Sequence, residues 1–291
     1  MKSFASMRVA PVKDPAMHSE YSITADVLSF RRCSRQYGHF AVYGFVPAQA
    51  TQLYFGIVIH QVLDRAHRQF LGRVDGKAKG VPSDADIGEH FRAVTEALRA
   101  RGIRPYSRRA EDSAKDYLVR FNSTWGPSLY PLVVDTEAKL KCNMRSYILT
   151  GVVDVLARSP PAGGPAVREI WDYKGSHRVD DDSKEMADYK FQMQVYAELY
   201  RRRFGELPAQ AVLCFIPETE PAKMFVTVPF DEATISKAME EFARTVEEIE
   251  RRKGSDDWSP PLVAPSRETC SACDIRWDCP TVNGQFRRPP L

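Results

Sequence analysis

The segment GVVDVLARSPPAGGPAVREIWDYKGSH, residues 151–177, constrains this chain more than any other part of its sequence. Two apolar stretches of strand length flank a turn rich in proline and glycine, a pattern that predicts a β-hairpin. The first stretch carries Asp154, and the second ends Asp172-Tyr173-Lys174. Because alternate residues of a strand point to the same face, Asp172 and Lys174 share one face and Tyr173 points to the other. The hairpin therefore gathers two carboxylates and an ammonium group on strands that otherwise belong to the core.

The chemistry of this trio indicates a metal site. An aspartate beside a turn is often only a turn former, so Asp154 alone would not indicate a site. Two buried carboxylates with one lysine, however, would cost several kcal/mol without compensation. A divalent cation supplies that compensation, and carboxylate oxygens suit Mg²⁺ or Mn²⁺. Lys174 then lies where it can orient a water molecule or stabilise the transition state of phosphodiester hydrolysis.

The apolar pattern of the whole chain predicts a mixed α/β fold, with a central mixed sheet flanked by helices. We expect residues 1–20 to form a flexible tail and residues 21–291 to form a single domain. Within it, residues 21–130 are predicted as a helical block, 131–253 as the sheet-containing core and 254–291 as a cysteine-rich tail. In the helical block we expect one helix up to about Tyr37, with Ser22 and Thr24 as possible caps, and further helices over about 84–100 and 110–123. The predicted strands and helices of the core are residues 131–143, 145–158, 166–174, 183–204 (helix), 209–218, 223–230 and 232–252 (helix, capped by Asp231).

The charge balance excludes a globally basic nucleic-acid binder, because 41 basic residues face 38 acidic ones and the net charge is only +3. Short basic runs occur, and a solvated helix face is the plain expectation for each: 31–32, 108–109, 201–203 and 251–253. The first twenty residues hold no apolar segment typical of a secretion signal, and no stretch approaches the about 20 apolar residues needed to span a bilayer. We therefore expect a cytoplasmic protein that does not contact membranes.

The hairpin resembles the D…(D/E)xK core of the PD-(D/E)XK nuclease superfamily, in Asp154, Asp172, Tyr173 and Lys174. The order of elements also resembles that family's core. The resemblance implies a restriction-endonuclease-like sheet and a phosphodiester hydrolase that uses Mg²⁺ or Mn²⁺. It implies that Asp154, Asp172 and Lys174 are catalytic, and that both aspartates and the backbone carbonyl of Tyr173 bind the metal.

Two further motifs are similar to those of the RecB-like branch of this superfamily. Gln192 and Tyr196, at i and i+4 on the helix after the Asp-Tyr-Lys strand, resemble the QxxxY motif, which faces the active site and the nucleic acid. Gly56 and His60 resemble the GxxxH segment, whose histidine is an additional metal ligand. Glu137 resembles a glutamate that the branch often carries in the preceding strand, and it is kept as a supporting residue.

Three of the six cysteines, Cys270, Cys273 and Cys279, lie close together near the C-terminus and suit metal ligation in a reducing compartment. With Cys33 as a fourth ligand, they resemble the four-cysteine arrangement of iron–sulfur RecB-like nucleases, among them AddB-type nuclease domains and CRISPR-associated adaptation exonucleases. That resemblance implies a [4Fe–4S] cluster that ties the cysteine-rich tail to Cys33. A zinc site with four cysteines fits the spacing as well. Cys142 and Cys214 are predicted to be buried strand residues.

The sequence thus favours a metal-dependent DNA nuclease, an exonuclease acting on single-stranded DNA or DNA ends. The alternative is a non-catalytic DNA-binding or assembly subunit of a repair, recombination or CRISPR adaptation complex. Relatives of that kind usually lose the aspartate or lysine, and Asp154, Asp172 and Lys174 are all present here. No G-x-x-x-x-G-K-[ST] motif occurs, so any unwinding of DNA needs a helicase partner, and an integrase is a second possible partner.

Overall fold

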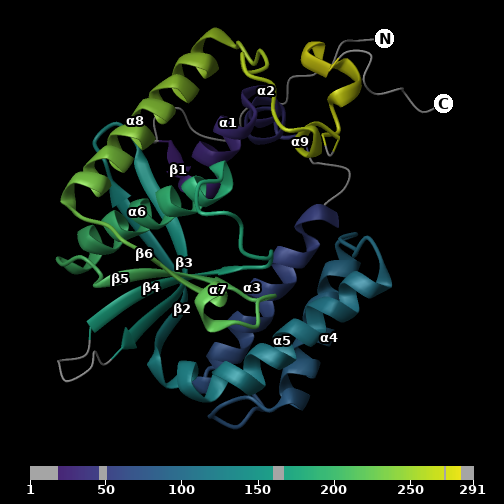
Figure 1. Cartoon of the computed structure of the whole chain (residues 1–291). Helices are drawn as coiled ribbons and strands as arrows, with labels where there is room; N and C mark the ends of the chain where they lie inside the picture. The colour runs from purple at the N-terminus through teal and green to yellow at the C-terminus, as the bar shows by residue number, and fades with distance from the viewer. Residues whose placement is uncertain (1–18, 46–50, 160–166, 272, 283–291) are drawn as a thin grey trace. The chain divides into compact units, whose positions relative to one another are not determined.

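The structure is a computed structural model that describes residues 19–45, 51–159, 167–271 and 273–282 (Figure 1). Residues 1–18 of the predicted tail and residues 160–166 of the predicted hairpin turn lie outside this part. The chain divides into two compact units. We call residues 49–141 and 151–235 the sheet unit, and residues 1–48, 142–150 and 236–291 the cysteine unit. The single domain predicted for residues 21–291 stays a prediction.

The sheet unit contains a mixed sheet, as the sequence predicts. The antiparallel pair β3 (Ile148–Ser159) and β4 (Val167–Lys174) runs from Val155 opposite Trp171 to Ser159 opposite Val167. Strand β5 (Gln210–Phe215) pairs with β4 in parallel, and β6 (Phe225–Val228) pairs with β5 in antiparallel fashion. Strand β2 (Val133–Asn143) pairs with β3. Strand β4 thus has neighbours on both edges, and Ile170–Tyr173 are buried.

Three helices of the sheet unit, α3 (Thr51–Phe70), α4 (Asp84–Ala100) and α5 (Arg108–Leu129), pack against one another (Figure 1). Their apolar residues form one buried cluster with Trp171 and Tyr173 of β4. Helix α4 begins with a capping box in which Ser83 and Asp86 satisfy each other's backbone N–H groups. Helix α5 is longer than the sequence suggests, since it continues from the predicted end near residue 123 to Leu129.

Helix α6 (Lys184–Phe204) contacts β4 and β5, and Gly151 allows it to lie close to β3. A Cβ atom on Gly151 would lie 2.7 Å from Cδ1 of Leu199, which is closer than real Cβ atoms approach, and 3.0 Å from Cε1 of Tyr196, which is unusually tight. The short helix α7 (Pro221–Met224) connects β5 and β6, and α8 (Glu232–Ser255) begins in the sheet unit. Asp231 caps α8 as predicted, because its carboxylate accepts a hydrogen bond from the Thr234 N–H.

In the cysteine unit, the short strand β1 (Glu20–Ser22) pairs in parallel with Ile148–Thr150, the first residues of β3. The helix predicted up to Tyr37 is wrong as one continuous element. The structure has four short helical segments there, η2 (Ile23–Leu28), α1 (Ser29–Arg32), α2 (Ser34–Tyr37) and η3 (Gly38–Val42). The break falls at Cys33, whose backbone is extended at φ −161° and ψ 107° and whose Sγ accepts a hydrogen bond from the Gln36 N–H. Helices α9 (Arg267–Ser271), η5 (Arg276–Asp278) and η6 (Pro280–Val282) carry the later cysteines or flank them.

The basic runs mostly lie on helices beside acidic residues. Arg201 and Arg202 pair with Glu198, and Arg251 and Arg252 pair with Glu248. These runs therefore stabilise their own helices through contacts three and four residues apart. Among the described residues, no helix combines the length and apolar character needed to cross a membrane.

Candidate active site

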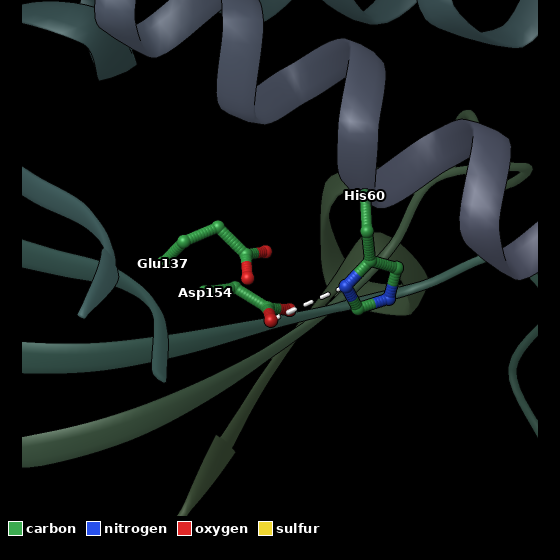
Figure 2. A group of neighbouring side chains, drawn as sticks. All are labelled: His60, Glu137 and Asp154. Carbon is green, nitrogen blue, oxygen red and sulfur yellow. Dashed lines mark ion pairs between the residues drawn. The ribbon is translucent and has the colours of Figure 1, made fainter. Parts of the chain in front are cut away.

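Asp154 is the central residue of the candidate site. Its side chain projects from β3, where the residue is only 8% exposed. Oδ2 accepts a hydrogen bond from the backbone N–H of Tyr173 at 2.7 Å, so the neighbouring strand fixes the carboxylate. Oδ1 lies 3.2 Å from Nδ1 of His60, a residue of α3 (Figure 2). The carboxylate therefore joins the hairpin to the helix.

Glu137 of β2 completes a compact group with these two residues. One donor atom each of His60, Glu137 and Asp154 lies within 4.8 Å of the others, a spacing at which they could hold a metal ion (Figure 2). The backbone of Glu137 has φ 48°, a left-handed conformation that costs energy for a residue with a side chain. Such strain inside a strand is typical of a bulge that redirects a side chain, and here the carboxyl group points to Asp154.

Two of these groups, Glu137 and His60, have raised pKa values. Burial raises the pKa of Glu137 to about 7, and the charge of Asp154 adds to this effect. Burial opposes protonation of His60, but the Asp154 carboxylate outweighs it and raises the pKa of His60 to about 9. The raised pKa values follow from negative charge that is concentrated at this buried site, which favours the binding of protons or of another cation.

Asp172 lies on β4, is 2% exposed, and is bound on both carboxylate oxygens. Lys174 Nζ is 2.6 Å from Oδ2, and Gln192 of α6 donates its Nε2–H to Oδ1 at 2.6 Å. Gln192 also accepts a hydrogen bond from Lys174 Nζ on Oε1, at 3.0 Å. Burial raises the pKa of Asp172, while the nearby Lys174 charge opposes this. The amide of Gln192 therefore links the carboxylate and the ammonium group, which share one face of the strand as predicted.

Tyr173 points away from this face, also as predicted. Its hydroxyl lies 2.7 Å from Nε2 of His67, two turns after His60 on α3. Both rings are buried, and burial lowers the pKa of His67 to about 3, so this imidazole is neutral. The contact fastens α3 to β4. The role predicted for the Tyr173 carbonyl as a metal ligand stays a prediction.

Tyr196 lies on α6, one turn after Gln192, and is 4% exposed. Its ring is near Gly151, whose missing side chain leaves room for it. Burial raises the pKa of its hydroxyl far above the usual range. The structure thus shows Tyr196 packed between the helix and β3, and its predicted contact with nucleic acid stays a prediction.

In the cysteine unit, Cys33, Cys270, Cys273 and Cys279 line one cavity together with Arg35, Gln36 and Arg276. Burial raises the pKa of Cys273 to about 11 and also raises that of Cys33. All four cysteines belong to the described residues, and no three of their Sγ atoms lie within 4.8 Å of one another. Of the other two, Cys214 is buried in β5 as predicted, whereas Cys142 is only partly buried because it lies near the end of β2.

The structure thus brings together residues from five elements, α3, β2, β3, β4 and α6: His60, Glu137, Asp154, Asp172, Lys174 and Gln192. Tyr189 is a further neighbour of this group that was not predicted from the sequence. Its ring centroid lies 4.0 Å from Lys174 Nζ. The spacing to Gln192, three residues along α6, was the available signal, since such residues share a helix face.

Comparison with known proteins places the chain in a family. A family model described as "PD-(D/E)XK nuclease superfamily" matches residues 25–280. A solved structure called "Putative exonuclease", from Eubacterium rectale, resembles this chain with a TM-score of 0.51 and 14% sequence identity. The match covers 93% of this chain and 90% of that one, and it shows a shared fold. The protein SSO0001 is 14% identical over 88% of this chain and 96% of its own, with a TM-score of 0.33. No curated protein matches the chain by sequence.

Proposed function

Because this chain belongs to the PD-(D/E)XK nuclease superfamily, we propose that it is a metal-dependent deoxyribonuclease, an exonuclease acting on single-stranded DNA or DNA ends. The main support is the geometry of Asp154, whose two oxygens contact His60 and the Tyr173 N–H beside the Asp172–Lys174 pair. The superfamily implies phosphodiester hydrolysis, and these residues are of the types that this reaction needs. The name of the similarly folded Eubacterium rectale protein agrees with an exonuclease.

The donor set fits a divalent cation of the Mg²⁺ or Mn²⁺ type. Asp154, Asp172 and Glu137 offer hard carboxylate oxygens, and His60 adds an imidazole nitrogen, which favours Mn²⁺ over Mg²⁺. The raised pKa values of His60 and Glu137 agree with a site that takes up positive charge. Together with the Tyr173 carbonyl, these residues would hold the ion, and the ion would polarise the phosphate and activate water.

Lys174 and Gln192 serve the substrate side of the proposed reaction. The side chain of Lys174 is 11% exposed, and its ammonium group stabilises negative charge that develops on the phosphate during hydrolysis. Gln192 fixes the side chains of Lys174 and Asp172 relative to each other, because its amide group forms a hydrogen bond with both. We expect Tyr196 to support Gln192 from the next turn of α6. This set of residues favours a catalytic protein over the non-catalytic DNA-binding or assembly subunit.

We also propose that the cavity of the cysteine unit holds a [4Fe–4S] cluster, as in the RecB-like branch. Four cysteines line the cavity together with Arg35 and Arg276, and burial favours the protonated thiols unless a metal takes the thiolates as ligands. A single zinc ion at about 2.3 Å from each sulfur would need sulfurs only about 3.8 Å apart. No three of the four sulfurs lie within 4.8 Å of one another, so the support for the cluster is the cavity that the cysteines share and the four-cysteine resemblance. We propose a cytoplasmic location, where the reducing environment would keep these thiols available as ligands.

We also propose a helicase or an integrase as a protein partner.

A cleavage assay tests the nuclease. Purified protein is incubated with end-labelled single- and double-stranded DNA in Mn²⁺, Mg²⁺ or EDTA, and products are followed with time. We expect metal-dependent shortening from the ends, and a loss of rate on the order of a thousandfold or more in Asp172→Ala. Binding of DNA without cleavage by the wild type would favour the assembly subunit instead. Near-normal cleavage by Asp172→Ala would remove the metal-nuclease mechanism.

A further inference from the structure

We propose that Tyr189 is a positioning residue that holds the ammonium group of Lys174 against the face of its ring. This inference rests on the proposed function, since it serves the role given to Lys174 there. Nζ of Lys174 lies 4.0 Å from the centroid of the Tyr189 ring. That distance is well inside the about 6 Å within which the negative face of an aromatic ring attracts a cation.

The ammonium group has three N–H donors and three neighbours that can receive them. Two are Oδ2 of Asp172 at 2.6 Å and Oε1 of Gln192 at 3.0 Å. The ring of Tyr189 is the third. Because the Lys174 side chain is only 11% exposed, water screens these contacts weakly. The position of Nζ is therefore set by one charged, one neutral and one aromatic group.

The aromatic contact differs from the ion pair in one respect that matters for a metal-dependent site. Asp172 is both the partner of Lys174 and a proposed metal ligand, so its oxygens cannot serve a cation and the ammonium group equally. Positive charge near Asp172 would also repel Lys174. The Tyr189 ring has no carboxylate oxygen, so a metal ion would not compete with Lys174 for this contact. Tyr189 thus keeps Lys174 in the site when Asp172 is engaged elsewhere.

The fold fixes the ring in this position. Tyr189 and Gln192 lie three residues apart on α6, so both face β4. The Tyr189 hydroxyl donates to Glu185, one turn earlier on the same helix. The ring also packs against Phe215 of β5, with centroids 6.1 Å apart. These contacts orient the ring without using its face toward Lys174.

Two substitutions separate the ring from the hydroxyl group. Tyr189→Phe keeps the ring and loses the bond to Glu185, whereas Tyr189→Leu loses the ring and keeps an apolar side chain. Tyr106→Leu is the matched control, because Tyr106 is 80% exposed. The first measurement is nuclear magnetic resonance of lysine side chains, with Lys174 assigned through Lys174→Arg. A proton held over a ring face is shifted upfield by the ring current, and this signal does not depend on activity.

We expect the Lys174 ε-methylene signals to be shifted upfield in wild type and Tyr189→Phe, with and without Mg²⁺, and to return to the ordinary position in Tyr189→Leu. In the cleavage assay, kcat/KM should fall roughly threefold to thirtyfold in Tyr189→Leu, while Tyr189→Phe recovers most of it. Tyr106→Leu should match wild type in both measurements.

Unshifted Lys174 signals in wild type, or full activity in Tyr189→Leu, would overturn the inference. The wild-type spectrum alone decides on the contact, should Tyr189→Leu fail to fold. A wild-type protein that shows the shift yet cleaves no DNA under any metal condition would instead overturn the proposed nuclease function.

Discussion

The contact between Asp154 and His60 can be tested directly, because it changes the protonation of one imidazole. The Asp154→Asn substitution keeps the size of the side chain and removes its charge. In the wild type, the carboxylate 3.2 Å from Nδ1 raises the pKa of His60 from the ordinary 6.5 to about 9, against the effect of burial. Without that carboxylate, burial acts with little opposition, so we expect the pKa of His60 in Asp154→Asn to be 6.5 or lower.

A fall from about 9 to 6.5 corresponds to about 3 kcal/mol before solvent screening is considered. The His60 side chain is 32% exposed, and solvent screening lowers the value to about 2 kcal/mol or less. The sign also predicts a pH effect on unfolding. Since the folded-state pKa is raised, the pair stabilises metal-free wild type fully below pH 6.5, and this contribution is lost as pH rises through about 9. Asp154→Asn should lack that loss.

The assay is a titration of the histidine ring protons by nuclear magnetic resonance in EDTA, with the His60 signal identified by its absence in His60→Gln. Burial lowers the pKa of His39, His67 and His90, so none of these should be confused with it. Asp135→Asn is the control, since Asp135 lies on the same sheet but pairs with Arg73 at the surface. A His60 pKa near 9 in both wild type and Asp154→Asn would refute the assigned contact.

Three further outcomes follow from the same structure. Metal affinity measured by calorimetry should rise up to about pH 9, because His60, with a pKa raised to about 9, and Glu137, with a pKa raised to about 7, must release their protons to the competing cation; Glu137→Gln should reduce the slope below about pH 7, and an equal slope there would argue against Glu137 as a ligand. Gly151→Ala should lower the free energy of unfolding by about 1–3 kcal/mol in thermal melts, while Gly88→Ala, where nothing lies within 4 Å, should not destabilise; equal melts would contradict the close packing of α6 on β3. Anaerobic protein should be brown, with about four irons per chain, and Cys33→Ser should lose both colour and thermal stability while Cys214→Ser keeps the iron; zinc without iron would refute the cluster.

The sequence alone determined the local framework of this protein. The strands of the hairpin, the shared face of Asp172 and Lys174, and the opposite direction of Tyr173 all follow from the two-residue period of a strand. The helix of residues 184–204 and the cap at Asp231 follow equally from local spacing and side-chain chemistry. These features depend on neighbours within a few residues, which a sequence pattern records.

Only the tertiary structure decided which side chains meet. Glu137 reaches Asp154 through a left-handed backbone at φ 48°, a strained conformation that no residue pattern in β2 announces. The two bonds of Gln192 and the ring of Tyr189 over Lys174 depend on the depth at which α6 lies on the sheet, and Gly151 sets that depth on β3. Likewise, Cys33 interrupts a predicted helix and shares a cavity with cysteines more than two hundred residues later. Periodicity fixes the direction of a side chain within its own element, whereas packing between elements fixes its partner, because that partner belongs to a segment distant in the chain.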